Sequence, residues 1–235
     1  MTRAGLAAAA AAVLLTGCPS FSTMGTARTI PKGSNQFHVG MGGQQLRDWS
    51  VTESGTLDNV TVPAFEVGLS HGVSDSVEVG GKVWFLGAEL NSKFQLFRSA
   101  SPTSGVDLAL APALSFYPLS GENNAGQQTS GGLAFLHLPL LLGVNVGGGS
   151  QVILAPRLTG TFAWGSAAGG TSSTASVLWA GGSLGLALKL GDSFRLMPQV
   201  SVAYPFATTR DLQATTDLAF QGVIVQGQLG LLFGG

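Results

Sequence analysis

The sequence has few charged residues, a single cysteine and, after residue 17, no long apolar run. Charged side chains make up 10% of its 235 residues, whereas soluble domains average about 25%. One cysteine excludes an internal disulfide, and a net charge of −1 gives no electrostatic reason to expect nucleic-acid binding. No stretch after residue 17 approaches the ~18 to 20 apolar residues of a transmembrane helix. A hydrophobic chain without a spanning helix points to β-strands, and its length fits one domain.

Residues 1–17 have the layout of a secretory signal, with Arg3 ahead of an apolar stretch and small residues at its end. The tetrapeptide Leu-Thr-Gly-Cys at 15–18 resembles the lipobox of bacterial lipoproteins. This resemblance implies that the lipoprotein-processing machinery removes the signal and that Cys18 becomes the lipidated N-terminus. Pro19 follows in place of Asp, so sorting to the outer membrane is expected. The alternative is an ordinary secretory signal with a chance cysteine.

Residues 18–34 are small and polar and contain Pro31 and Gly33. This composition is typical of a tether more than of a packed element. We therefore expect a lipidated tether at the periplasmic end of the first strand, followed by one domain at 35–235.

From Asn35 onward apolar residues alternate with polar or small ones, which is the period of β-strands. The segment 136–146, for example, places Leu136, Leu138 and Leu140 on one face and His137 on the other. The pattern predicts about ten strands, with eight as an alternative. Their approximate ranges are 35–42, 62–72, 77–85, 88–98, 106–117, 133–146, 152–164, 178–190, 194–206 and 218–233.

The connections between these strands alternate between short and long. Short turns are expected at 73–76, 99–104, 147–150 and 191–193, and long connections at 47–61, 119–132, 165–175 and 207–217. Only the connection near Gly87 breaks the alternation. Short periplasmic turns and longer external loops are typical of outer-membrane barrels. An interfacial aromatic girdle is expected at the loop-proximal strand ends, formed by Tyr117, Trp164, Tyr204 and Phe206.

Several prolines lie inside predicted strands, although proline removes a hydrogen-bond donor from the ladder. Pro112, Pro156 and Pro198 belong to a repeated Leu-X-Pro-X-(Leu/Val) pattern, and Pro139 lies between them in sequence. We interpret the repeated prolines as bulges or register devices.

The fold class expected is all-β, an antiparallel up-and-down transmembrane barrel whose apolar face points outward. The strands are long, and the other face mixes charged with tiny side chains, as a narrow lumen requires. A soluble β-sandwich or a lipocalin-like barrel is the alternative. Residues 35–235 resemble the small outer-membrane β-barrel superfamily. Phe233 resembles the near-terminal aromatic read by the barrel-assembly machinery, but two glycines follow it.

The inward positions predict a mixed-charge network, because unpaired charge in a low-dielectric interior is costly. A three-residue hairpin loop through Ser74 would place Glu66 opposite Lys82 and Ser70 opposite Glu78. The structural interpretation is a self-neutralising lumen; the functional one is a polar path for a small solute. The network comprises Glu66, Glu78, Lys82, Glu89, Lys93, Asp107, His137, Arg157, Lys189 and Arg195.

Catalysis, a metal site and a cofactor are not expected. His38 near Glu66 is compatible with a lipid-modifying hydrolase, but no nucleophile-elbow motif is present, and three scattered histidines form no ligand cluster. The leading function is a structural or surface-interaction barrel, with outer-membrane lipid around it and partners at the four long connections. The alternatives are a narrow pore or transporter for small solutes or lipids and, third, a lipid-modifying hydrolase.

Overall fold

The computed structural model describes residues 20–47, 49–50, 56–57, 60–122, 128–166, 172–210 and 222–235. The predicted signal peptide and Cys18 lie outside these ranges. Within them, no helix is long and apolar enough to cross a membrane. The elements are strands: β1 (Asn35–Arg47), β2 (Trp49–Ser50), β3 (Thr56–Leu57), β4 (Val60–Ser74), β5 (Val77–Trp84), β6 (Gly87–Phe97), β7 (Ser104–Leu110), β8 (Ala113–Glu122), β9 (Gln128–Val146), β10 (Gln151–Ser166), β11 (Ser172–Lys189), β12 (Phe194–Arg210) and β13 (Val223–Gly234).

These strands form a closed, antiparallel, ten-stranded barrel, which confirms the predicted fold class. Strand β1 pairs with β4, the later barrel strands pair in sequence order, and β13 pairs with β1 from Arg47↔Val223 to Gln36↔Gly234 to close the sheet. The segments β7 and β8 together act as one barrel strand, because both pair with β6 and with β9. The pair β2–β3 is a separate two-stranded ribbon within the first long connection.

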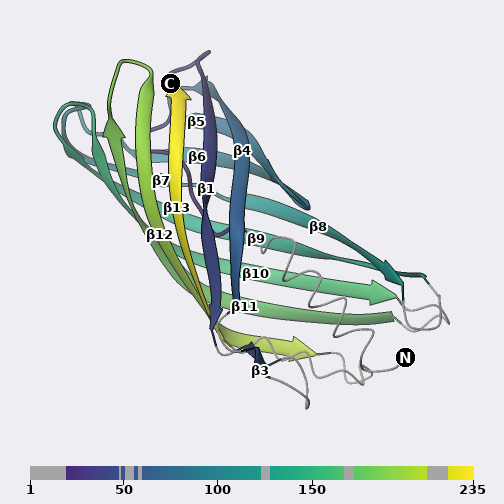
Figure 1. The fold of residues 1–235 in the computed structure, drawn as a ribbon. Coiled ribbons are helices and arrows are strands. Elements are labelled where there is room, and N and C mark those ends of the chain that lie inside the picture. Colours follow the sequence, from purple (N-terminus) through teal and green to yellow (C-terminus); the bar gives the residue numbers. More distant parts are fainter. Residues whose placement is uncertain are drawn as a thin grey trace.

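The short and long connections lie at opposite ends of the barrel (Figure 1). At one end, here the turn end, the four short turns lie with the C-terminus. The other end, the loop end, carries the long connections and the tight Phe85–Leu86 turn, the exception expected near Gly87. The strands run further than predicted: β8 continues to Glu122, β9 starts at Gln128, and β12 continues to Arg210. Part of each of these predicted external loops is therefore strand.

The prolines lie at interruptions of the ladder. Ala111 and Pro112 separate β7 from β8. The β9–β10 pairing is interrupted between Leu154↔Leu142 and Arg157↔Pro139, next to Pro156. The β11–β12 pairing is interrupted between Gly185↔Gln199 and Leu188↔Leu196, next to Pro198. These positions agree with the interpretation of the repeated prolines as register devices.

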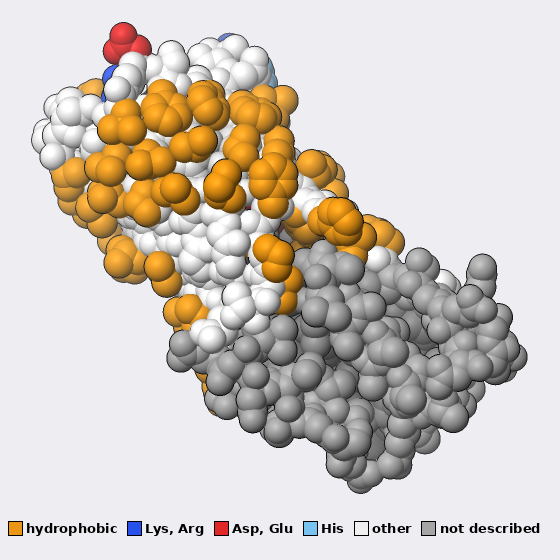
Figure 2. Space-filling view, in the orientation of Figure 1, with side chains coloured by type: hydrophobic (Ala, Val, Ile, Leu, Met, Phe, Trp, Pro, Cys, Tyr) orange, Lys and Arg blue, Asp and Glu red, His pale blue; other side chains and the backbone are white. Residues whose placement is uncertain are grey.

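The apolar face points outward, as predicted, and forms a belt on the surface in view (Figure 2). Its members include Phe65 on β4, Leu158 on β10 and Tyr204 on β12. Such an exterior suits lipid and not water. The girdle prediction is wrong for Tyr117, which is buried, since alternation turns it inward while its neighbour Phe116 faces outward.

Residues 20–34, which we call the lumen segment, lie inside the barrel as far as Ile30, and residues 31–33 are exposed at the turn end. Ser20, Phe21, Ser22, Ala27 and Ile30 are all buried, and they contact strands from every side of the barrel. The expectation of an unpacked tether is therefore wrong. Small polar residues of this kind also suit an extended chain in a narrow polar lumen, where bulky side chains would not fit.

Candidate functional site: the filled lumen

The lumen segment is held through its backbone by wall side chains. The backbone N–H groups of Phe21, Thr23, Ala27, Thr29 and Ile30 each donate a hydrogen bond to a wall side chain, as buried backbone donors must find acceptors. The acceptors are the side-chain oxygens of Gln226 (2.7 Å), Gln199 (3.2 Å), Gln151 (2.8 Å), Gln95 (2.8 Å) and Glu78 (3.1 Å), in the same order.

These glutamines were not among the predicted site residues. A signal for them exists in the sequence, because glutamine recurs at inward-facing strand positions. Gln199, for example, lies on the polar face of β12 and Gln226 on that of β13. A glutamine side chain both accepts and donates, so a ring of them satisfies an irregular backbone in a lumen.

The strongest contacts surround Glu66 and Lys82. The carboxylate of Glu66 accepts hydrogen bonds from the hydroxyls of Ser20 and Ser22, each at 2.5 Å. The ammonium of Lys82 lies 3.4 Å from the Glu66 carboxylate and 3.6 Å from that of Glu89, and donates to the Ser22 carbonyl at 3.0 Å. Glu66 and Lys82 therefore each have an oppositely charged partner, and each also contacts the lumen segment.

The predicted register of this hairpin is wrong, although Lys82 does reach Glu66. The turn has two residues, Asp75 and Ser76, and the pairing shifts between Gly72 and Ser74. Lys82 is therefore opposite Gly68, and Glu66 is opposite Trp84. The Lys82–Glu66 ion pair is thus diagonal across the strands, which long side chains span easily.

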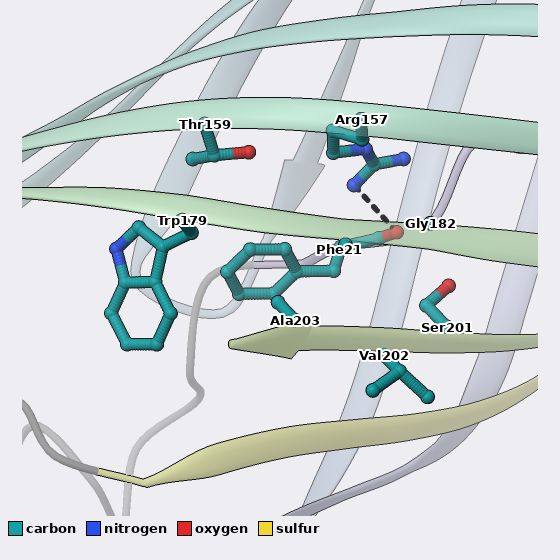
Figure 3. A pocket seen from close by; sticks show the side chains of 9 residues that line it. Phe21, Arg157, Thr159, Trp179, Gly182, Ser201, Val202 and Ala203 are labelled. Atoms are coloured by element: carbon teal, nitrogen blue, oxygen red, sulfur yellow. Dashed lines mark hydrogen bonds between the residues drawn. The ribbon is translucent and has the colours of Figure 1, made fainter. Parts of the chain in front are cut away.

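Arg157 clamps the lumen segment from the opposite wall. Its guanidinium donates to the carbonyl of Phe21 at 2.7 Å and to the hydroxyl of Thr23. The Phe21 ring lines a recess together with Trp179 and Thr159, and the space left in it is too small for a water molecule (Figure 3). The indole of Trp179 donates to the Thr161 hydroxyl at 2.9 Å, which fixes one wall of that recess.

A second ion pair joins the lumen segment to the wall near the turn end. Arg28 lies 3.0 Å from the fully buried carboxylate of Asp107, which also accepts hydrogen bonds from Asn145 and Gln151. Arg28 also donates to the Ser99 carbonyl at 2.9 Å. The positive charge that neutralises Asp107 therefore comes from the lumen segment itself. Such a buried carboxylate would be costly without it.

Apolar side chains of the lumen segment also pack against the barrel wall. Ala27 joins a buried cluster with Ala111, Leu141 and other wall residues, and Met24 packs against a second cluster that contains Met197 and Leu232. A Cβ at Gly230 would lie 2.5 Å from the Met24 sulfur, so a larger residue there would displace the methionine side chain. The lumen thus contains apolar patches that only the lumen segment covers.

The structure places the predicted network residues as follows. Glu66, Glu78, Lys82, Glu89, Lys93, Asp107, His137 and Arg157 are buried in the lumen, whereas Lys189 and Arg195 are half-buried. Lys93 pairs with Glu78 at 2.8 Å. Among the described residues, four ion pairs join seven charged side chains, one of which is Arg28 of the lumen segment. His137 stacks on Phe135 and bonds the Thr159 hydroxyl at 2.9 Å.

A small polar cavity remains beside the segment. It measures about 50 Å³, which holds a few water molecules. Among the described residues, His38, His137 and Arg157 each have one ring or guanidinium nitrogen without a protein partner, and all three line this cavity. Its polarity and size suit internal water.

In the part of the chain that the structure describes, no group of three His, Cys, Asp or Glu side chains could hold a metal ion. The hydroxyls of Ser20 and Ser22 near Glu66 are buried and are bonded to a carboxylate, not to a histidine. The lumen is therefore arranged to bind a peptide segment.

No protein-family model and no curated protein sequence matches the chain. Solved structures with a similar fold include Neisserial surface protein A (12% identity, 86% of this chain and 99% of that one, TM-score 0.44). The translocator domain of the autotransporter NalP from Neisseria meningitidis is similar at 13% identity, 87% and 89% coverage and TM-score 0.47. The outer membrane protease OmpT from Escherichia coli is similar at 8% identity, 89% and 100% coverage and TM-score 0.46. These likenesses concern the barrel fold alone.

Proposed function

We propose that the chain is a lipid-anchored barrel of the bacterial outer membrane that has a structural or surface-interaction role and does not conduct. The observation that carries this proposal is the lumen segment, which fills the interior and is bonded to the wall along its length. A barrel of about eight strands is filled by its own side chains, and wider barrels enclose space. Here a peptide occupies that space.

The function then belongs to the surfaces of the barrel and not to its lumen. Its outer face contacts lipid, and its loop end presents the extended hairpins β8–β9 and β10–β11 and the outer end of β12 to partners. The predicted partner regions at 47–61, 119–132, 165–175 and 207–217 all reach this end. The tips of these hairpins lie outside the described residues.

A narrow pore is the second candidate, and the polar cavity favours it. A line of His38, Lys82, Glu89 and Arg157 around about 50 Å³ would provide polar contacts for a small solute. The lumen segment closes this cavity toward the loop end, where Phe21 and Ser20 are buried. Conduction would require the segment to leave, at the cost of its hydrogen bonds and of the Arg28–Asp107 ion pair. A hydrolase lacks a comparable observation, and we propose that the chain is not an enzyme.

Planar-bilayer recording of the intact, purified protein tests the choice. A closed barrel should add no stepwise current above that of the protein-free bilayer. A reproducible ion-selective current from the intact chain would refute the closed-barrel proposal and favour the pore.

The lipid anchor is tested separately. Cells that make the protein with radiolabelled palmitate should label the wild-type chain and not Cys18→Ser. The Cys18→Ser protein should still fractionate with membranes, since the barrel is a second, independent anchor. Its full release into the soluble periplasm would contradict a membrane-spanning barrel.

A further inference from the structure

The lumen segment crosses the barrel from the loop side to the turn end, opposite in direction to β1. On the loop side, Ser20 is bonded to Glu66 of β4 and to the Tyr117 hydroxyl. Near the turn end, the Thr29 hydroxyl donates to the carbonyl of Asp75 at 2.7 Å. Between these points the segment forms neither helix nor strand, so its backbone groups depend on wall side chains. The barrel therefore binds it as it would bind a peptide ligand.

The glutamine contacts hold this segment but do not select its sequence. Gln226, Gln151 and Gln95 accept hydrogen bonds from backbone N–H groups, which every residue except proline carries. The Gln95 amide also donates to the Ala27 carbonyl at 3.2 Å. These bonds would serve any peptide that follows the same path. Selection of one sequence has to come from the side chains of the segment.

Two serines provide the first side-chain contacts. The hydroxyls of Ser20 and Ser22 donate to the two different oxygens of the Glu66 carboxylate. Lys82 donates to the Ser22 hydroxyl at 3.2 Å. Because Glu66 and Lys82 are buried, residues without a hydroxyl at positions 20 and 22 would leave charged groups short of hydrogen bonds.

The aromatic ring of Phe21 provides the second contact. The side chain is buried, and its ring lies edge-on to His137 and Trp179, with centroids 5.8 and 6.3 Å away (Figure 3). Edge-to-face pairs of this kind stabilise an aromatic ring beyond its buried area. The recess therefore favours an aromatic side chain at this position.

Arg28 provides the third contact. Its guanidinium meets both oxygens of the Asp107 carboxylate, with Nε 3.1 Å from one and a terminal nitrogen 3.0 Å from the other. Such a two-point contact fits the planar fork of arginine and not the ammonium of lysine. Asp107 is fully buried and needs this positive partner.

We propose that the lumen is a sequence-selective binding site for a peptide, and that residues 20–30 of the chain are its tethered ligand. The class of ligand is an irregular peptide with a hydroxyl–aromatic–hydroxyl triplet, followed seven residues after the aromatic one by an arginine. This assigns a ligand to the lumen, which the structural role leaves unassigned, and it does not depend on lipidation of Cys18.

The covalent link to β1 is separate from this recognition. Residues 31–33 are exposed at the turn end, whereas the side chains that the wall recognises lie deeper in the barrel. The link raises the effective concentration of the ligand but adds no contact to the three described above. A cut in the exposed stretch should therefore leave the segment bound.

Release of the cut segment tests the proposal. The chain from residue 18 is made with Cys18→Ser, so that no acyl chain retains the fragment, and with a protease recognition sequence between Lys32 and Gly33. It is folded in detergent micelles, verified by heat-modifiable migration and then cleaved. Gel filtration with mass spectrometry follows the loss of the N-terminal fragment. Arg28→Ala is compared with Lys32→Ala, which removes the same charge at an exposed position.

The unsubstituted fragment should stay bound through gel filtration. Arg28→Ala should speed its release by about 100-fold or more, because a buried carboxylate loses its partner. Lys32→Ala should stay within about twofold, as surface changes usually do. Immediate loss of the unsubstituted fragment, or equal release rates for the two variants, would overturn the proposal.

A second measurement uses peptides, which avoid any effect of a substitution on folding of the barrel. A fluorescent peptide of residues 20–32 is added in excess to the cleaved, unsubstituted protein, and its binding is measured by anisotropy. Unlabelled competitors carry the native sequence, Phe21→Ala, Arg28→Ala or the same residues in permuted order. The native peptide should compete about 100-fold better than the other three. A permuted peptide that competes as well as the native one would show that the lumen holds a backbone without selecting its sequence.

Discussion

The outer and inner faces of this barrel differ in how strongly each position is specified. Outward residues such as Leu154, Leu158 and Phe162 are exposed on the apolar exterior, and in the proposed membrane one apolar side chain would serve there nearly as well as another. Inward residues such as Glu66 and Arg157 each contact a particular atom of the lumen segment. Because lipid is fluid and a peptide is not, substitutions of similar size should have very different effects on the two faces.

Removal of the lumen segment should have the largest effect. Deletion of residues 20–33, which joins Pro19 to Ser34, leaves Asp107 without Arg28 and exposes the apolar patches at Leu141 and Met197. We expect an open, water-filled lumen, seen as stepwise current in planar bilayers. A deletion protein that folds, by heat-modifiable migration, and still adds no current would show that the wall closes the lumen by itself.

Introduction of an arginine at the middle of the outer face should have the second-largest effect, which is a loss of stability. In Leu158→Arg the charge faces lipid between Leu154 and Phe162, and a barrel loses about 2–4 kcal/mol for Arg at the bilayer midplane. The measurement is urea unfolding of the protein in lipid vesicles. Bilayer current should not change, since Leu158 does not face the lumen; a new current would mean that the two faces are coupled.

Loss of the Arg157 side chain, which holds the lumen segment from the inner face, should have a somewhat smaller effect on the protein. Arg157→Ala removes the hydrogen bonds to Phe21 and Thr23, and each bond to a charged group contributes about 1.5–3 kcal/mol. We expect faster hydrogen exchange at Phe21 and Thr23 and brief current openings. Arg195→Ala, at a half-buried position near the turn end, is the control and should change neither. Equal effects of both variants would contradict the clamp.

The smallest effect should come from a conservative change on the outer face. Leu158→Met keeps the volume and remains apolar, and surface changes of this kind usually stay within about 0.5 kcal/mol. Unfolding in vesicles should be indistinguishable from wild type. A loss comparable with that of Leu158→Arg would show that Leu158 makes a specific contact and that the proposed difference between the two faces does not hold.

Much of the barrel was predictable because its signal is local. Alternation at Leu136, Leu138 and Leu140 predicted which residues face outward, and the short Gly-rich turn at 147–150 predicted the end at which the strands return. Tyr117 was assigned to the outer girdle because it is aromatic, although the alternation along its strand already placed it on the inward face. The β4–β5 register failed because a bulge at Gly72 to Ser74 depends on backbone geometry that no pattern displays.

The contacts of the lumen segment were not predictable in the same way. Ser20 is 46 residues from Glu66 and Phe21 is 205 residues from Gln226. Nothing local marks Ser20 or Ser22 as partners of a carboxylate, and residues 20–34 have no period that predicts an element. Only the inward glutamines, such as Gln199 and Gln226, carried a signal that the lumen holds a backbone to satisfy.

The sequence alone determined a β-barrel with an apolar exterior and a charged interior, because the two-residue period of a strand assigns each side chain to one face. The tertiary structure alone decided what fills that interior and in which direction the N-terminal chain runs. That decision depends on closure of the sheet, which brings Glu66, Arg157 and Gln226 around one axis and leaves their charges and amides to be satisfied by the chain's own beginning.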